Sequence, residues 1–186
     1  MSSRAENAKT VLKRAELIFA KDEIDLNVDQ MANDIREKLK DADPLVLCVM
    51  TGGIIAASEL LLRMDFPLEV DYIHATRYGN DTQGTELKWI AGPRKPLKGR
   101  SILVIDDILD EGHTLKEILH YCSEQGAEAV YSAVLVQKDH GRNTGLERAD
   151  FTGMIVPDRY VFGYGMDYKG YLRNVAGIYA AHKDDE

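Results

Sequence analysis

The chain has 186 residues, of which 45% are hydrophobic and 29% are charged, and this composition fits one globular domain over residues 1–186. Its formal net charge of −8 argues against a nucleic-acid partner, because phosphate contacts need a basic face. The longest apolar stretch, residues 44–57, contains two adjacent glycines and is too short to span a bilayer, and residues 1–10 lack the apolar core of a signal peptide. We therefore expect a cytoplasmic protein with no membrane partner.

Hydrophobic periodicity along the chain predicts strands that alternate with helices. Apolar residues recur at helical spacing near the start of the chain and after each predicted strand, whereas short continuous apolar runs are typical of strands buried on both faces. The predicted helices cover residues 6–21, 28–39, 54–64 and 115–125, and the predicted strands cover 44–50, 68–76, 101–106 and 129–138. This alternation predicts a mainly parallel sheet with right-handed crossovers.

Two segments depart from the alternation. Residues 77–100 are polar and rich in glycine, and an irregular segment of this length in a compact domain is typical of a lid or hairpin over a site. Residues 151–181 are rich in aromatic side chains and contain short strand-like pieces. We expect both segments to border the site.

Unusual sequences follow three of the predicted strands. They are the Met50-Thr51-Gly52-Gly53 turn, the acidic stretch that begins with Asp106-Asp107, and Lys138-Asp139. In open α/β sheets ligands bind outside the carboxyl ends of the strands, so these residues are expected to converge there.

The acidic stretch combines two kinds of ligand-binding group. The turn made of Asp110, Glu111, Gly112, His113 and Thr114 opens a predicted helix, and main-chain N–H groups at a helix N-terminus bind phosphate. The carboxylates of Asp106 and Asp107 can accept hydrogen bonds from sugar hydroxyls and attract a divalent cation such as Mg²⁺. A sugar phosphate is the ligand that needs both.

Two motifs carry a resemblance to a known family. VIDDILDEGHTL (104–115) resembles the phosphoribosyl-pyrophosphate (PRPP) signature of type I phosphoribosyltransferases, and VPDRYVFGYGMDYKGYLRN (156–174) resembles the C-terminal segment of the purine-salvage branch, the hypoxanthine-guanine phosphoribosyltransferases. The order of the elements is similar over nearly the whole chain. The resemblance implies the type I phosphoribosyltransferase fold, an α/β fold in which a parallel sheet has helices on both faces and the terminal segments form a small hood.

The resemblance implies roles for residues on the purine side of the site. Asp110 lies near purine N7 as the general base, and Lys138 donates to the 6-oxo group. Tyr160 stacks on the purine, and the main chain of Val161 contacts the edge of the base.

It also implies roles on the sugar-phosphate side. Residues 110–114 bind the 5-phosphate, Asp106 and Asp107 bind ribose and Mg²⁺, Asp167 helps to hold Mg²⁺, and Arg173 meets pyrophosphate beside Thr51 and Gly52. The peptide bond that enters position 51 is expected to be cis, and Tyr78 belongs to a loop that closes over the site.

The chain departs from the family pattern at four positions. Thr51 stands where a basic residue is common, and Arg77 stands where serine is common, so that only Tyr78 carries over from the mobile loop. Glu111 and His113 replace Thr and Lys in the phosphate loop, which can be tolerated if the main chain binds the phosphate.

The other four histidines show no metal spacing and are interpreted as structural or surface residues: His74, His120, His140 and His182.

The implied reaction transfers the phosphoribosyl group of PRPP to N9 of a 6-oxopurine, with Mg²⁺ as cofactor and a homodimer or homotetramer as the assembly. The sequence does not rank hypoxanthine, guanine and xanthine. Three alternatives remain open: a nonenzymatic PRPP-binding regulator on the same fold, a phosphoribosyltransferase for another base such as a pyrimidine, and a receiver domain.

Overall fold

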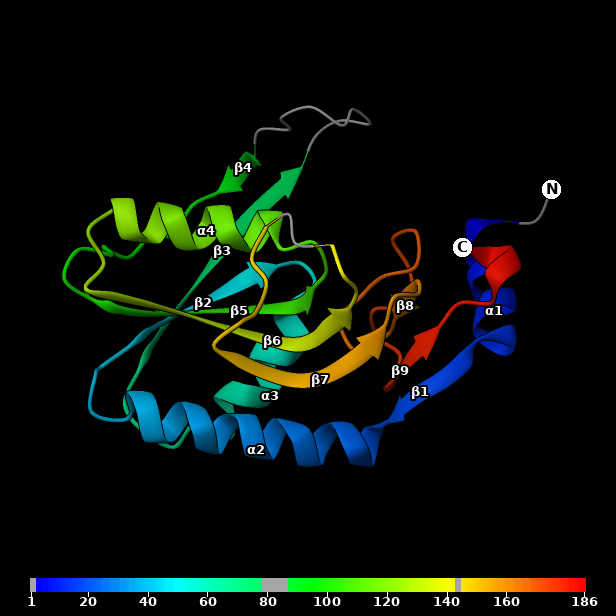
Figure 1. The fold of residues 1–186 in the computed structure, drawn as a ribbon, viewed down its shortest axis with the longest axis horizontal. Helices are drawn as coiled ribbons and strands as arrows, with labels where there is room; N and C mark the ends of the chain where they lie inside the picture. Colours follow the sequence, from blue (N-terminus) through cyan, green and yellow to red (C-terminus); the bar gives the residue numbers. More distant parts are fainter. Residues whose placement is uncertain (1–2, 78–86, 143–144) are drawn as a thin grey trace.

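A six-stranded sheet forms the centre of the computed structural model, which describes residues 3–77, 87–142 and 145–186 (Figure 1). The strand order is β4-β3-β2-β5-β6-β7, and every neighbouring pair is parallel except β3 and β4. The strands are β2 (Leu45–Met50), β3 (Glu69–Arg77), β4 (Leu87–Ala91), β5 (Ser101–Leu109), β6 (Ala129–Asp139) and β7 (Phe151–Pro157).

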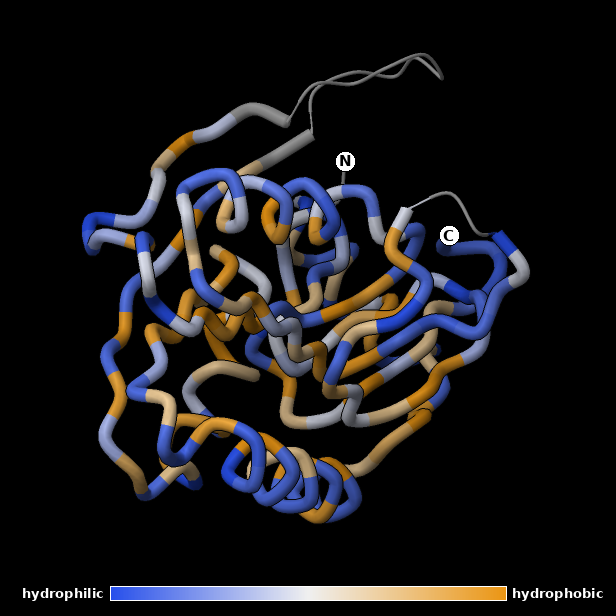
Figure 2. Tube along the Cα trace, turned by 60° about the vertical axis from the view of Figure 1, so that its left-hand side comes forward, coloured by the Kyte–Doolittle hydropathy of each residue, from blue (hydrophilic) through white to orange (hydrophobic). Residues whose placement is uncertain are grey.

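Helices cover both faces of this sheet, as predicted. Figure 1 shows α4 (His113–Glu124) on one face, and α2 (Lys21–Leu39) and α3 (Ile54–Leu61) on the other. Blue and orange alternate around α2 at the foot of the molecule in Figure 2, because its apolar side chains, Ile24, Val28, Met31 and Ile35 among them, recur at helical spacing and are buried. The central strands β2 and β5 are buried almost throughout, which explains their continuous apolar runs.

A small second sheet joins segments from opposite ends of the sequence, which confirms the predicted hood. Its order is β1-β9-β8 with antiparallel neighbours, and α1 packs beside it (Figure 1). The hood elements are α1 (Arg4–Arg14), β1 (Glu16–Ala20), β8 (Val161–Phe162), β9 (Gly177–Ala180) and the 3₁₀ turn η1 (Lys183–Asp185). In the described ranges no helix has both the length and the apolar character needed to cross a bilayer.

The predicted helix over residues 6–21 was wrong in its second half. Residues Glu16–Ala20 form strand β1, because their main chain pairs with β9 while Leu17 remains half exposed. The next helix begins at Lys21 and not at Val28, with the Glu23 carboxylate accepting the Ala20 N–H at 2.9 Å. A short run with apolar residues at several spacings fits helix and strand alike, and tertiary pairing decided between them.

Candidate active site

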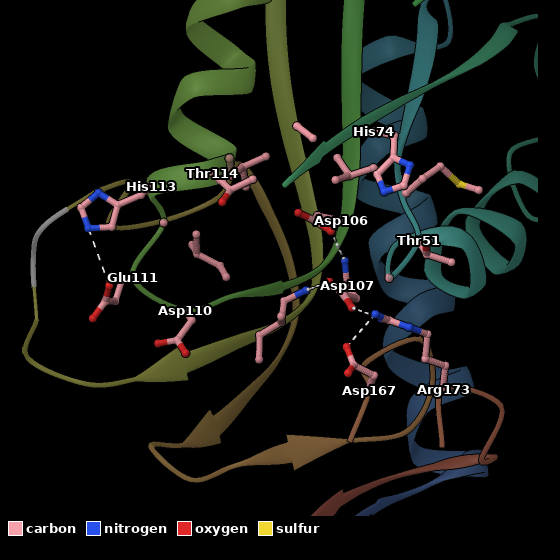
Figure 3. Close-up of a pocket in the computed structure, with 18 residues that line it drawn as sticks. Thr51, His74, Asp106, Asp107, Asp110, Glu111, His113, Thr114, Asp167 and Arg173 are labelled. Carbon is pink, nitrogen blue, oxygen red and sulfur yellow. Dashed lines mark hydrogen bonds and ion pairs between the residues drawn. The ribbon is translucent and has the colours of Figure 1, made fainter. Parts of the chain in front are cut away.

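Two adjoining cavities lie at the candidate site. The larger of these two, of about 520 Å³, lies at the carboxyl ends of the parallel strands (Figure 3). The turn after β2, the end of β5 and the start of α4 contribute most of its wall, and two residues of the C-terminal segment close it. Among the lining residues are Thr51, Gly52, His74, Asp106, Asp107, Asp110, Glu111, Gly112, His113, Thr114, Asp167 and Arg173. The residues that follow β2 and β5 therefore converge at this edge of the sheet, as the topology predicted.

The acid pair at the end of β5 is buried, with Asp106 and Asp107 each only 9% exposed. Burial raises the pKa of Asp106 well above its usual range, and the neighbouring charge of Asp107 adds to the shift. Burial also raises the pKa of Asp107, although the main-chain and Arg173 contacts oppose this. Burial therefore disfavours the ionised form of both acids, and a bound cation would favour it.

Gly52 packs directly against this acid pair. A Cβ at position 52 would lie 1.9 Å from Asp107 Oδ2, so any side chain larger than hydrogen would displace the carboxylate. The Met50–Thr51 peptide bond that precedes it is cis, which confirms the expectation from the resemblance.

The turn over residues 110–114, predicted to bind phosphate, has the backbone geometry expected of an anion site. Gly112 adopts the left-handed conformation with φ of 78°, and α4 begins at the next residue. The first N–H groups of a helix have no partner within the helix, and they carry the positive end of its dipole. Beside these N–H groups, the Glu111 carboxylate and the His113 imidazole lie 3.7 Å apart.

Arg173 connects the C-terminal segment to the acid pair. Its guanidinium donates to Asp167 Oδ1 and to the Gly165 carbonyl oxygen, both at 2.6 Å, and lies 3.8 Å from Asp107 Oδ2 (Figure 3). Since Arg173 and Asp167 are paired, Asp167 does not join Asp106 and Asp107: among the described residues no three acid, histidine or cysteine side chains are grouped as metal ligands.

A smaller cavity of about 200 Å³ adjoins the first, and the two share Asp107, Ile108, Asp110 and Asp167. Its other lining residues are Lys138, Tyr160, Val161 and Met166, so the predicted purine-binding residues lie together. The ring of Tyr160 packs edge-on against Tyr168, with 5.5 Å between the ring centroids. This gives the cavity an aromatic wall on one side and the Lys138 ammonium group on another.

Asp110 lies between the two cavities and is surrounded by cationic and imidazole groups. Lys138 Nζ is 2.7 Å from its Oδ2 atom, while His140 Nε2 and Arg142 Nη2 lie 3.2 and 3.5 Å from Oδ1. Asp158 holds Arg142 through two contacts of 2.6 and 2.8 Å. The two neighbours of Asp110 beyond Lys138, His140 and Arg142, were not found from the sequence, and neither was Asp158, which holds Arg142.

His74 and His140 were interpreted as structural or surface residues, yet the structure places both at the site. His74, opposite Met50 in the β2–β3 register, lines the larger cavity, and His140 contacts Asp110. No sequence spacing marks either histidine as a site residue. His74 reaches the cavity through the pairing of β3 with β2, and His140 reaches Asp110 from the turn that follows β6. The predicted lid residue Tyr78 lies outside the described residues.

Comparison with known proteins agrees with this geometry. The family model described as phosphoribosyl transferase domain matches residues 15–169. The chain belongs to the phosphoribosyltransferase family. A hypoxanthine-guanine phosphoribosyltransferase of Bacillus subtilis is 32% identical over 163 residues, which cover 87% of this chain and 90% of that protein.

Two further relatives define the extent of the similarity. The bifunctional protein TilS/HprT of Listeria innocua is 32% identical over 87% of this phosphoribosyltransferase chain, which spans only 25% of that protein's length. The crystal structure of a hypoxanthine phosphoribosyltransferase from Staphylococcus aureus superposes with a TM-score of 0.88 at 22% identity, over 94% of this chain and 96% of that one. The type I phosphoribosyltransferase fold predicted from the sequence is thus confirmed.

Proposed function

We propose that this phosphoribosyltransferase moves the 5-phosphoribosyl group of PRPP to N9 of a 6-oxopurine, releasing pyrophosphate and forming the nucleoside monophosphate. The observation that carries the proposal is the pair of adjoining cavities that share Asp107 and Asp110. One cavity combines a helix N-terminus with buried carboxylates, and the other combines an aromatic wall with a lysine. The names of the relatives support a purine acceptor: hypoxanthine and guanine for the Bacillus subtilis protein.

The larger cavity suits PRPP. Main-chain N–H groups of residues 110–114 would bind the 5-phosphate together with the Thr114 hydroxyl. Asp106 and Asp107 would accept hydrogen bonds from the ribose hydroxyls, and Arg173 would meet the pyrophosphate beside Thr51 and Gly52.

The acid pair also fits Mg²⁺, which takes one or two protein carboxylates and completes its coordination with substrate oxygens and water. Burial raises the pKa values of Asp106 and Asp107, so their ionised forms would be favoured by a cation bound beside them. Asp167 would join them on the pyrophosphate side if Arg173 turned toward the leaving group. Bound Mg²⁺ would supply positive charge to the pyrophosphate as it leaves.

The smaller cavity suits the purine. Tyr160 would stack on the base, Val161 would offer main-chain contacts, and Lys138 would donate to the 6-oxo oxygen. Lys138 pairs with Asp110 in the structure, so the entering base separates the two groups and receives a contact from each.

The protein's own residues would then assist bond formation at N9. As N9 attacks C1 of the ribose, the purine becomes more acidic, and Asp110 would accept the N7 proton as general base. Arg173 and the loop N–H groups would stabilise the charge that develops on pyrophosphate. The loop that carries Tyr78 would exclude water.

The decisive experiment is a transfer assay with PRPP and Mg²⁺ in which hypoxanthine, guanine, xanthine, adenine and uracil are compared. We expect nucleoside monophosphate from the 6-oxopurines and none from adenine or uracil. PRPP binding without turnover of any base would contradict the proposal and indicate a regulator on this fold. We further infer a cytoplasmic homodimer or homotetramer, and light scattering of the purified protein would test the assembly.

A further inference from the structure

The two oxygens of the Asp110 carboxylate face different partners. Oδ2 is bound by Lys138 at 2.7 Å, and Oδ1 faces His140 Nε2 at 3.2 Å and Arg142 Nη2 at 3.5 Å. Asp158 already holds Arg142 through both of its carboxylate oxygens. His140 is therefore the nearer partner of Oδ1 and, unlike Arg142, is not held by Asp158.

The tautomer of His140 follows from its other ring nitrogen. The main-chain N–H of Arg142 donates to Nδ1 at 3.2 Å, which makes Nδ1 an acceptor. A neutral imidazole with an accepting Nδ1 carries its hydrogen on Nε2. The Nε2–H group thus lies on the side of Asp110.

This donor is buried without an aligned acceptor. The His140 side chain is only 8% exposed, and Nε2 forms no hydrogen bond of acceptable geometry within the described part of the chain, despite its 3.2 Å separation from Oδ1. Unsatisfied buried donors are rare in proteins. A small rotation of the Asp110 carboxylate would satisfy this one.

The proposed function supplies the reason for such a rotation. Lys138 holds Oδ2 before the purine enters, and it must leave Asp110 to reach the 6-oxo group of the base. The carboxylate then loses its strongest contact at the moment when its orientation toward N7 matters most.

Resting on that function, we propose that His140 is a positioning residue for the general base. When Lys138 moves to the purine, His140 Nε2–H donates to Oδ1 of Asp110 and leaves Oδ2 directed at the N7 proton. Proton relay through the ring is excluded by its geometry, because Nε2 already carries hydrogen and the lone pair of Nδ1 is used by the main chain. His140 orients the carboxylate and exchanges no proton.

Two substitutions separate the donor from the shape of the side chain. His140→Leu removes the Nε2–H group and is expected to lower kcat by about ten- to a hundredfold, the usual effect of losing a hydrogen bond to a charged group, with the KM for PRPP unchanged. His140→Gln places an amide donor at similar reach and is expected to return kcat to within about threefold of the parent. His120→Leu is the matched control, since His120 is exposed on α4 with Glu124 as its neighbour.

A double-mutant cycle with Asp110→Asn tests whether His140 acts through Asp110. We expect His140→Leu to have no further effect on kcat in the Asp110→Asn protein. An equal loss in both backgrounds, a kcat for His140→Leu within about threefold of the parent, or a His140→Gln protein as slow as His140→Leu would each overturn the inference. A parent protein that transfers to no purine would overturn the proposed function and this inference with it, whereas the other outcomes leave the proposed function standing.

Discussion

The acid pair Asp106–Asp107 and the single acid Asp110 stand close together at the end of β5, yet their surroundings are opposite. The pair is 9% exposed at each residue, and Arg173, 3.8 Å from Asp107, is its cationic neighbour at the cavity wall. The Asp110 side chain is 42% exposed and is contacted by Lys138, His140 and Arg142. The acid pair thus has Arg173 as its cationic neighbour, whereas Asp110 has Lys138, Arg142 and the imidazole of His140.

This difference follows from where the strand ends. Asp106 and Asp107 still belong to β5 and are packed against Gly52, Gly53 and Gly165, while Asp110 follows the last strand residue and faces the turn after β6. A cationic ligand is therefore favoured at the pair, and a ligand that can replace Lys138 is favoured at Asp110. One strand end thus offers two sites of different chemistry.

The largest effect is expected from Asp110→Asn. The amide keeps the shape of the side chain and the main-chain donors of the loop but cannot accept the purine proton, so kcat should fall by roughly 10² to 10⁴. PRPP binding should survive, which calorimetry can measure, and thermal melting serves as the folding control. Turnover within about threefold of the parent would show that Asp110 is not the general base and so does not differ from the acid pair in this way. His113 would then be the next candidate base to test.

Asp107→Asn should change substrate affinity and not the chemical step. Loss of one carboxylate from the pair weakens contacts with ribose and Mg²⁺, and we expect the KM for PRPP to rise about tenfold with a smaller change in kcat. Asp22→Asn, an exposed acid in the first turn of α2, is the control. A fall in kcat alone would place Asp107 with Asp110 in proton transfer.

Lys138→Met sharpens the purine side of the comparison. The variant loses the donor to the 6-oxo group, so the KM for hypoxanthine should rise about tenfold while the KM for PRPP stays the same. Lys98→Met, at an exposed position, controls for the change of charge. Equal KM values for hypoxanthine in the variant and the parent would show that Lys138 neutralises Asp110 and does not donate a hydrogen bond to the 6-oxo group of the base.

The smallest effect is expected on stability, from Asp106→Asn. Because the folded protein raises the pKa of Asp106, it binds the proton more tightly than the unfolded chain does, so stability is highest below the ordinary carboxyl range and falls as pH rises toward the raised pKa. The asparagine amide of the variant does not ionise, so the variant does not lose this stability as the pH rises. At pH 8 the variant should melt about 2 to 4 °C above the parent, the shift that about 1 kcal/mol produces in a chain of this size.

The same comparison at pH 4 provides the control for Asp106→Asn, because the parent carboxyl is then protonated in the fold and the advantage should disappear. An advantage of equal size at both pH values would mean that packing, and not charge, is responsible.

The placement of the acids and of the glycine turn at the end of β5 could be predicted from the sequence because it depends on residues close together in the chain. A buried apolar run followed by Asp106-Asp107 and by a glycine turn before a helix fixes the acids and the phosphate loop relative to one strand. The central sheet follows from the alternation of strands and helices, since parallel strands require crossovers. The residues predicted to bind the purine were assigned only through resemblance, because Tyr160, Phe162 and Tyr164 alternate and periodicity alone does not choose among them.

The contacts around Asp110 could not be predicted in this way. His140 and Arg142 reach it because the turn after β6 folds back toward the end of β5, and Asp158 arrives from the turn after β7. Strand β1 was missed for a related reason: its partner β9 lies at the other end of the sequence, so no local pattern distinguished it from a helix. Local sequence reports local geometry, whereas these features depend on distant pairing.

The hood sheet has a consequence for the order in which the protein can be made. Val161, which borders the smaller cavity, pairs with Ala180 of β9, and Ala180 pairs with Glu16 of β1. On the ribosome β1 emerges early and has no β9 to pair with until the end of synthesis, when the acid pair and the turn over residues 110–114 have already been made. We expect a nascent chain that stops before β9 to contain the acid pair and the turn over residues 110–114 without an ordered hood beside the smaller cavity.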